Sequence, residues 1–80
     1  METLSQFKKR SRNEIDRLKQ TFGVTNAKLS EHSGVSTVTI GKISSHCQDV
    51  SAETIEKVLM SARQIVSERV TEYQKIQEEA

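Results

Sequence analysis

The stretch that decides the fold of this 80-residue chain is Asn26-Ala-Lys-Leu-Ser-Glu-His-Ser-Gly-Val-Ser-Thr-Val-Thr-Ile-Gly-Lys-Ile-Ser-Ser45. It predicts two short helices joined by a tight turn at residues 33–35. Such a turn favours glycine, and Gly34 stands in the middle of it. The two helices must also cross closely, and Ser30 is small enough to permit that approach. We therefore expect a helix-turn-helix unit; an ordinary helical hairpin with a glycine turn is the alternative.

The spacing of apolar residues indicates that the second half of this stretch is helical. By propensity alone, the β-branched residues over 35–40 favour a strand. A strand has a period of two, which would split Val35, Ile40 and Ile43 between two faces. In a helix, Ile40 and Ile43 share one face, and Leu29 of the preceding helix can pack against them. We therefore predict a helix here.

Helical signals continue toward the N-terminus. Apolar residues recur at steps of three and four over residues 4–22, and Gly23 fits a helix stop. The start of this helix is open, because residues 3–6 and residues 11–14 both fit a capping box. If the second box is used, residues 1–10 form a basic arm.

The later helices are each preceded by a residue that can cap them. Thr25, Ser36 and Ser51 have side-chain oxygens that can accept a hydrogen bond from the first helical turn. No Gly or Pro interrupts the chain after Ser51, and a helix of ~30 residues spans ~45 Å, too long to lie wholly on a domain of this size. The expected organisation is an N-terminal arm or helix extension (1–10), a helix-turn-helix domain (11–62) and a C-terminal helix extension for dimerisation (63–80).

The composition is that of one all-α domain. Apolar residues make up 34% and charged residues 29% of the chain, with three Gly and no Pro, which is typical of a soluble helical protein. No apolar run approaches the ~20 residues of a membrane span, and residues 1–10 lack the apolar stretch of a signal peptide. The single cysteine, Cys47, excludes an internal disulfide. We expect a cytoplasmic protein.

Positive charge is concentrated in the first third of the chain. Residues 1–30 contain seven Lys or Arg and three acidic residues, although the whole chain carries a net charge of only +1. Such a local excess favours an anionic partner such as nucleic acid; a solvated basic helix face is the alternative. If the partner is DNA, the phosphate contacts are expected from Lys8, Lys9, Arg10 and Arg12.

Two families of transcriptional regulators resemble the chain over roughly residues 15–60. The stretch Gly23-Val-Thr-Asn-Ala-Lys-Leu-Ser-Glu-His-Ser-Gly-Val-Ser36 is similar to the helix-turn-helix opening of Cro and lambda-repressor-like (XRE) regulators. Residues 29–36, together with Val50-Ser-Ala-Glu-Thr-Ile-Glu-Lys-Val58, also resemble the headpiece of lac-repressor-type regulators. Val50 stands where the XRE pattern often has Pro. No ligand domain or hinge accompanies the headpiece, so no small-molecule ligand is implied. The resemblance implies a lambda-repressor-like domain of about four helices with a long C-terminal helix.

The resemblance also assigns site residues. In these families the second helix of the unit enters the major groove by its N-terminal end. The positions that would face base edges are Thr37, Val38 and Lys42. The positions that would contact phosphates are Thr25, Asn26 and Ser36. The presumed reading helix has no Arg, Gln or Asn, so we expect modest base readout and much affinity from phosphates. Gly41 either allows close approach to DNA or is a tolerated surface glycine.

Nothing in the sequence indicates an enzyme. There is no nucleophile elbow, phosphate loop or paired-carboxylate motif, and no cofactor is expected. The spacing of the metal-binding residue types matches no closed zinc pattern, so no metal site is predicted from His32, His46, Cys47 and Asp49.

The last helix carries an apolar stripe that we expect to continue beyond the core. Its members are Ile65, Val66, Val70, Tyr73 and Ile76. A second copy would bury this stripe, and a twofold axis would then set two reading helices ~34 Å apart on a pseudo-palindromic site. The expected function is therefore that of a transcriptional regulator that binds double-stranded DNA as a homodimer. The alternative is a protein-interaction or coiled-coil adaptor module, or the N-terminal domain of a longer protein, whose helix-turn-helix does not bind DNA.

Overall fold

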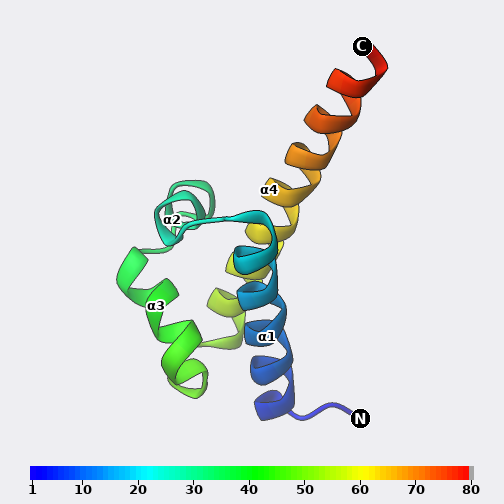
Figure 1. Ribbon diagram of the computed structural model, residues 1–80. Helices are drawn as coiled ribbons and strands as arrows, with labels where there is room; N and C mark the ends of the chain where they lie inside the picture. Colours follow the sequence, from blue (N-terminus) through cyan, green and yellow to red (C-terminus); the bar gives the residue numbers. More distant parts are fainter. Residues whose placement is uncertain (80) are drawn as a thin grey trace.

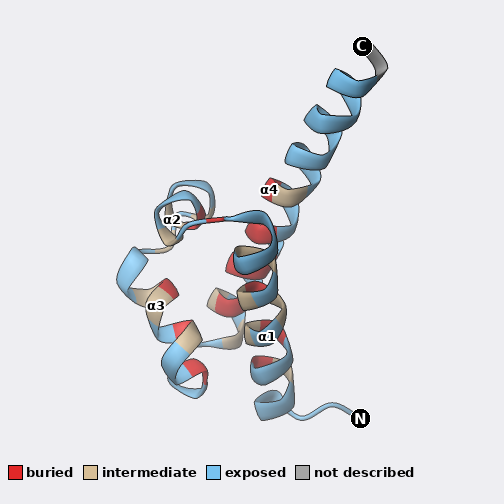
Figure 2. Cartoon of the chain, viewed as in Figure 1, coloured by how far each residue is buried: buried red, intermediate tan, exposed pale blue. Residues whose placement is uncertain are grey.

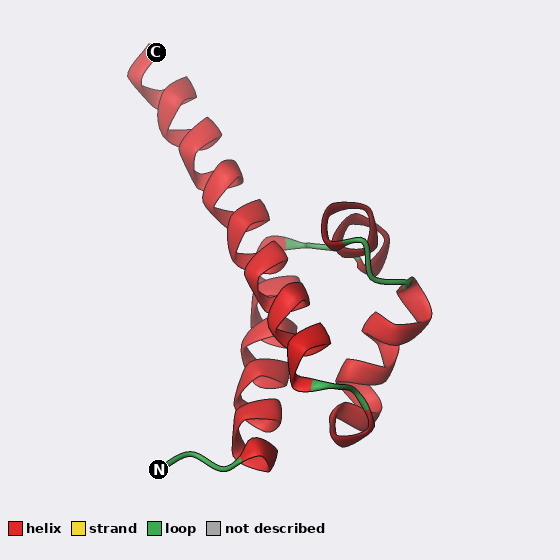
Figure 3. Ribbon diagram, turned by 180° about the vertical axis from the view of Figure 1, so that it is seen from behind, coloured by secondary structure: helices red, strands yellow, loops and turns green. Residues whose placement is uncertain are grey.

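The computed structural model describes residues 1–79, with side chains through Gln77. The elements are α1 (Leu4–Phe22), α2 (Asn26–Ser33), α3 (Thr37–His46), a single 3₁₀ turn η1 (Cys47–Asp49) and α4 (Ala52–Glu79). No strand occurs in residues 1–79, which confirms the expected all-α class (Figure 3). No helix in this described part combines the length and the apolar character of a membrane span.

The structure chooses between the two possible starts of the first helix. Thr3 is the N-cap of α1: its hydroxyl accepts from the Gln6 backbone N–H at 3.1 Å, and the Gln6 side chain accepts from the Thr3 backbone N–H at 2.9 Å. Residues 4–10 are therefore the first turns of α1 and not an arm. Ser11, the other possible cap, lies inside the helix and is fully buried.

The remaining helix boundaries agree with the expected caps and stops. Thr25, Ser36 and Ser51 each accept a hydrogen bond from the backbone N–H three residues later, at 3.1 to 3.2 Å. Gly23 and Gly34 end α1 and α2 with φ of +66° and +79°, a left-handed conformation that is open to glycine without a Cβ clash. The β-branched run of residues 35–40 thus lies in a turn and a helix, because capping and apolar spacing outweigh strand propensity.

The core lies where α1 and the first half of α4 meet α2, α3 and η1. α1 packs along α4, with α2 and α3 to one side of that pair (Figure 1). The buried residues gather on the facing sides of the helices, while α4 is exposed beyond the body (Figure 2). The cluster consists of Ile15, Val24, Leu29, Ile40, Ile43, Cys47, Val50, Ile55, Val58, Leu59, Ala62 and Ile65.

The core reaches further along α4 than the sequence predicts. Ile65 is only 2% exposed and belongs to the core of its own chain, and Val66 packs against that core. One turn later, Nη1 of Arg69 donates a hydrogen bond to the carbonyl oxygen of Phe22, at the end of α1. The prediction that Ile65 lies beyond the reach of the core is therefore wrong, because α1 accompanies α4 as far as Arg69. The exposed part of the stripe is Val70, Tyr73 and Ile76.

Candidate nucleic-acid interface

The outer face of α3 carries the three residues expected at base edges. Ile40 and Ile43 are buried, so the opposite side of α3 faces solvent. Val38 is 71% exposed, and Thr37 and Lys42 are also exposed. All three side chains are therefore accessible to a partner, and two of them lie in the first turn of α3.

Gly41 lies among these residues on α3. A Cβ built at Gly41 meets no atom of the chain within 4 Å, and its φ is not positive. Neither packing nor backbone conformation within the chain therefore requires glycine here. The result is a strip of bare backbone next to Lys42 on a helix that would be more stable with alanine at this position.

The capping residues offer backbone rather than side-chain donors. The hydroxyl oxygens of Thr25 and Ser36 already accept bonds from their own helices, and the Ser36 hydroxyl donates to Oγ1 of Thr39 at 3.0 Å. Oδ1 of Asn26 is buried without a partner. A phosphate at the start of α2 or of α3 would thus meet the free backbone N–H groups of the first helical turn, which is the usual anion site of a helix.

Lys8 is unavailable to a phosphate in this structure. It is only 8% exposed, and its Nζ donates a hydrogen bond to the backbone carbonyl oxygen of Gln48 at 3.1 Å. The Gln48 side chain in turn donates to the carbonyl oxygen of Ser5 at 3.2 Å. The ammonium group therefore fastens η1 to α1, which corrects the expectation that Lys8 is a surface cation.

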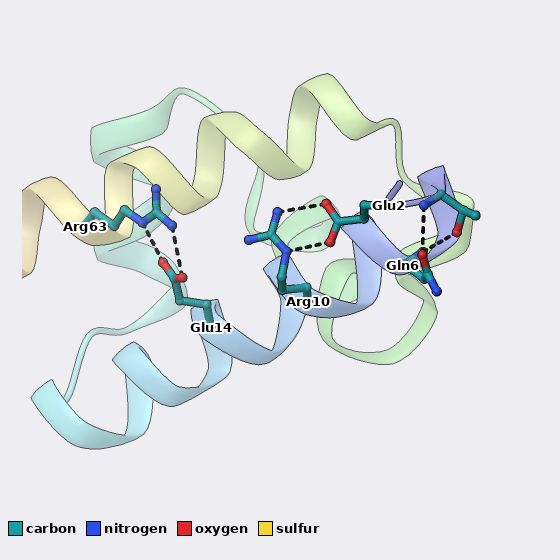
Figure 4. A network of polar contacts seen from close by, with 6 residues as sticks. Glu2, Gln6, Arg10, Glu14 and Arg63 are labelled. Atoms are coloured by element: carbon teal, nitrogen blue, oxygen red, sulfur yellow. Dashed lines mark hydrogen bonds and ion pairs between the residues drawn. The ribbon is translucent and has the colours of Figure 1, made fainter.

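The other three expected phosphate contacts divide between the solvent face of α1, where Lys9 and Arg10 lie, and the flank that carries Arg12. Arg10 donates two hydrogen bonds to the carboxylate of Glu2, at 2.7 and 3.0 Å (Figure 4). The guanidinium of Arg12 donates to Oδ1 of Asn13. Lys9 is exposed. The four expected phosphate contacts, Lys8 included, therefore do not form one patch.

Contacts with neighbouring helices identify the two flanks of α1. Asp16 accepts a hydrogen bond from the Ser44 hydroxyl of α3 at 2.9 Å, and Arg12 lies one turn earlier on that flank. Glu14 accepts two bonds from Arg63 of α4, at 2.5 and 3.0 Å. Arg12 is thus on the flank toward α3, and Glu14 is on the flank toward α4.

The solvent face of α1 forms a shallow groove that sequence reasoning missed. We call it the α1 groove; its lining residues are Gln6, Lys9, Arg10, Asn13, Glu14 and Arg17. Hydrogen bonding to Arg63 lowers the pKa of Glu14, and the charges of Arg10 and Arg17 lower it further. The spacing of the lining residues along the helix could have revealed this face from the sequence, since Arg10 and Arg17 are seven residues apart. Nothing in the sequence indicated that Arg63 of α4 would join it.

No metal-binding cluster appears in the described part of the chain. No three His, Cys, Asp or Glu side chains there come close enough together to hold an ion. Cys47 is buried in η1, whereas the preceding His46 is exposed and contacts the Ser45 hydroxyl at 2.8 Å.

Comparison with known proteins adds no family to this geometry. No protein-family model matches the chain, and no curated protein or solved structure matches it significantly. The function is therefore argued below from the surfaces described above.

Proposed function

We propose that the chain is a sequence-specific DNA-binding protein, a cytoplasmic transcriptional regulator whose α3 enters the major groove. The observation that carries this proposal is the division of α3 into two sides. Ile40 and Ile43 fasten one side to the core, and the other side presents Thr37, Val38 and Lys42 to solvent. A helix fits the major groove, and these methyl and ammonium groups suit thymine methyls and guanine acceptors.

The order and connection of the helices support a lambda-repressor-like arrangement. Three residues separate α2 from α3, and Gly34 takes the left-handed conformation between them. The first turns of both helices expose N–H groups that can bind phosphates on either side of the groove. Lys9 and Arg12 add side-chain cations, with Arg12 on the flank nearer α3.

The direct test is selection from random duplexes, followed by affinity measurements on the selected site. Combined Thr37→Ala and Val38→Ala substitutions should cost about 1–3 kcal/mol at that site and relax its sequence preference. Thr21→Ala, at an exposed position of α1, is a control that should leave binding unchanged. Selection that enriches no sequence, or a double variant that binds as tightly as the parent, contradicts the assignment of α3.

Salt dependence tests the phosphate contacts separately. Replacing Lys9 and Arg12 by Gln should flatten the slope of log K against log salt by about 0.9 for every phosphate that the variant no longer neutralises. Since Lys8 is buried, its substitution should change stability rather than the slope. An unchanged slope for the Lys9 and Arg12 variant would mean that both side chains are merely solvated.

The homodimer is the second part of the proposal. Val70, Tyr73 and Ile76 are 40%, 63% and 66% exposed on the part of α4 that leaves the body (Figure 1). Soluble monomers rarely leave such a stripe open, and a second copy of α4 would cover it. Light scattering should report a dimer at micromolar concentrations. Replacing the three residues by Ser should give a folded monomer, and a monomeric parent would contradict the dimer.

An adaptor function is the second candidate, and the same stripe favours it. Lys42 is the one charged residue among those expected at base edges, which is little for a DNA-reading surface. If α4 pairs with a different protein, the stripe variant should lose that partner while duplex binding stays absent in parent and variant alike. Selection from random DNA therefore separates the two functions.

A further inference from the structure

The α1 groove is a second charged surface, apart from the outer face of α3. Three cations line it, Lys9, Arg10 and Arg17, and Arg63 of α4 borders it through its pair with Glu14 (Figure 4). In Figure 1, α3 lies to one side of the α1–α4 pair, and it meets α1 at the hydrogen bond from the Ser44 hydroxyl to Asp16. The groove is on the solvent side of α1, turned away from the core.

Two of the three arginines at this surface, Arg10 and Arg63, already pair with carboxylates of the chain. Glu14 and Arg63 join neighbouring helices, so that pair is part of the fold. Glu2, in contrast, precedes α1, and both Glu2 and Arg10 are exposed. Its carboxylate meets the Arg10 guanidinium through two hydrogen bonds, the fork geometry that arginine makes with carboxylates. Glu2 therefore shows the chemistry that this surface accepts.

Arg10 has a second contact besides Glu2. Its guanidinium lies over the ring of Phe7, 5.7 Å from the ring centroid, which is within the range of a cation–π contact. Arg17 lies two helical turns away, ~10 Å along α1, and has no ion-pair partner in the described part of the chain. The side-chain amides of Gln6 and Asn13 line the surface as further polar groups.

We propose that the α1 groove docks an acidic segment of a partner protein, whose carboxylates replace Glu2 on Arg10 and bind Arg17. Glu2 is then a built-in competitor that weakens this docking in the free chain. The proposed contacts use Arg10 and Arg17 and no residue of α3, so the peptide experiment can fail while DNA binding by α3 stands, and the reverse.

The test measures binding of a labelled peptide of alternating glutamate and serine to the full chain. Fluorescence anisotropy at low salt reports the binding. A peptide with glutamine in place of glutamate is the uncharged control. Glu2→Gln should tighten binding of the acidic peptide, and Arg17→Gln should weaken it, each by about two- to fivefold, the range of one exposed ion pair. Lys75→Gln makes the same charge change on the far part of α4 and should have no effect.

Several outcomes would overturn the proposal. The acidic peptide does not bind, or the glutamine peptide binds as well. Glu2→Gln leaves the affinity unchanged, or Lys75→Gln weakens it as much as Arg17→Gln, which would indicate general charge attraction. Arg17→Gln weakens binding to duplex DNA as much as to the peptide, which would make this face a nucleic-acid surface. Circular dichroism on each variant verifies that these exposed substitutions leave the helices intact.

Discussion

The stability of the fold and its affinity for DNA should change in opposite directions when Gly41 is replaced by alanine. Glycine inside a helix costs about 0.5–1 kcal/mol relative to alanine. The added Cβ meets no atom of the chain within 4 Å, so no steric term opposes this gain. The free energy of unfolding should therefore rise by about 0.5–1 kcal/mol, which for a domain of this size raises Tm by roughly 2–8 °C.

Binding should weaken because the same methyl group stands on the outer face of α3. If the backbone at Gly41 approaches the floor of the major groove, an added methyl must displace a base edge or tilt the helix. Inserting a methyl into a close-packed contact costs about 1–3 kcal/mol, which corresponds to a roughly 5- to 150-fold loss of affinity for the selected site. Binding to unrelated duplexes depends on phosphates and should fall less.

Two measurements decide the matter. Thermal or denaturant unfolding reports the stability of the free chain, and anisotropy titration reports affinity for selected and unrelated duplexes. Gln20→Ala, at an exposed position of α1, controls for a helix-favouring change away from α3. A Gly41→Ala variant that is more stable and binds the selected duplex as tightly as the parent would refute close approach of α3. A less stable variant would refute the conclusion that neither packing nor backbone conformation in the free chain requires glycine at position 41.

Three further predictions concern the fold. Lys8→Ala should lower the free energy of unfolding by about 1–2 kcal/mol in urea titrations, since it removes both the packed stem and the bond to η1, whereas Lys9→Ala should stay within about 0.5 kcal/mol. Ser11→Ala should stabilise the chain by about 1 kcal/mol, because the Ser11 hydroxyl is fully buried without a partner; a loss of stability would mean that the hydroxyl is bonded in solution. Glu14→Gln should destabilise the chain at neutral pH but not in acid. The pKa of Glu14 is lowered by Arg63, so its contribution is complete above the ordinary value of 4.5 and is lost as the pH falls through the lowered pKa. A stability difference between parent and Glu14→Gln that does not shrink in acid unfolding titrations would contradict this assignment.

Local chemistry explains why the helix boundaries were predictable. A hydroxyl at the N-cap satisfies donors three residues away, and a glycine stop needs only its own backbone freedom. Both effects lie within a few residues, so Thr25, Ser36 and Gly34 could be identified without knowledge of the tertiary structure. The same holds for the inward face of α3, because the spacing of Ile40 and Ile43 allows only one regular structure to bury both.

The polar contacts between distant segments were not predictable. Lys8 lies in a run of basic residues, which on composition alone is typical of a solvated surface. Its carbonyl partner is 40 positions away, in a 3₁₀ turn that carries no sequence signal of its own. The pairing of Glu14 with Arg63 depends likewise on how α1 and α4 align. Charge counts along the sequence therefore predicted a basic segment. They could not show that one of its residues faces the core, another faces α3 and the others face solvent.

The length of α1 determines how far along α4 the chain's own core extends. This limit determines which truncation can test the dimer. Apolar spacing continues without a break through Ile65, so the sequence alone does not mark where the chain's own core stops. In the structure α1 runs beside α4 until the Phe22 carbonyl accepts from Arg69. A chain that ends at Gln64 would lack a core residue as well as the stripe, and unfolding would then be mistaken for dissociation of the dimer. A chain that ends at Arg69 keeps both Ile65 and the bond to Phe22, so this truncation separates self-association from folding.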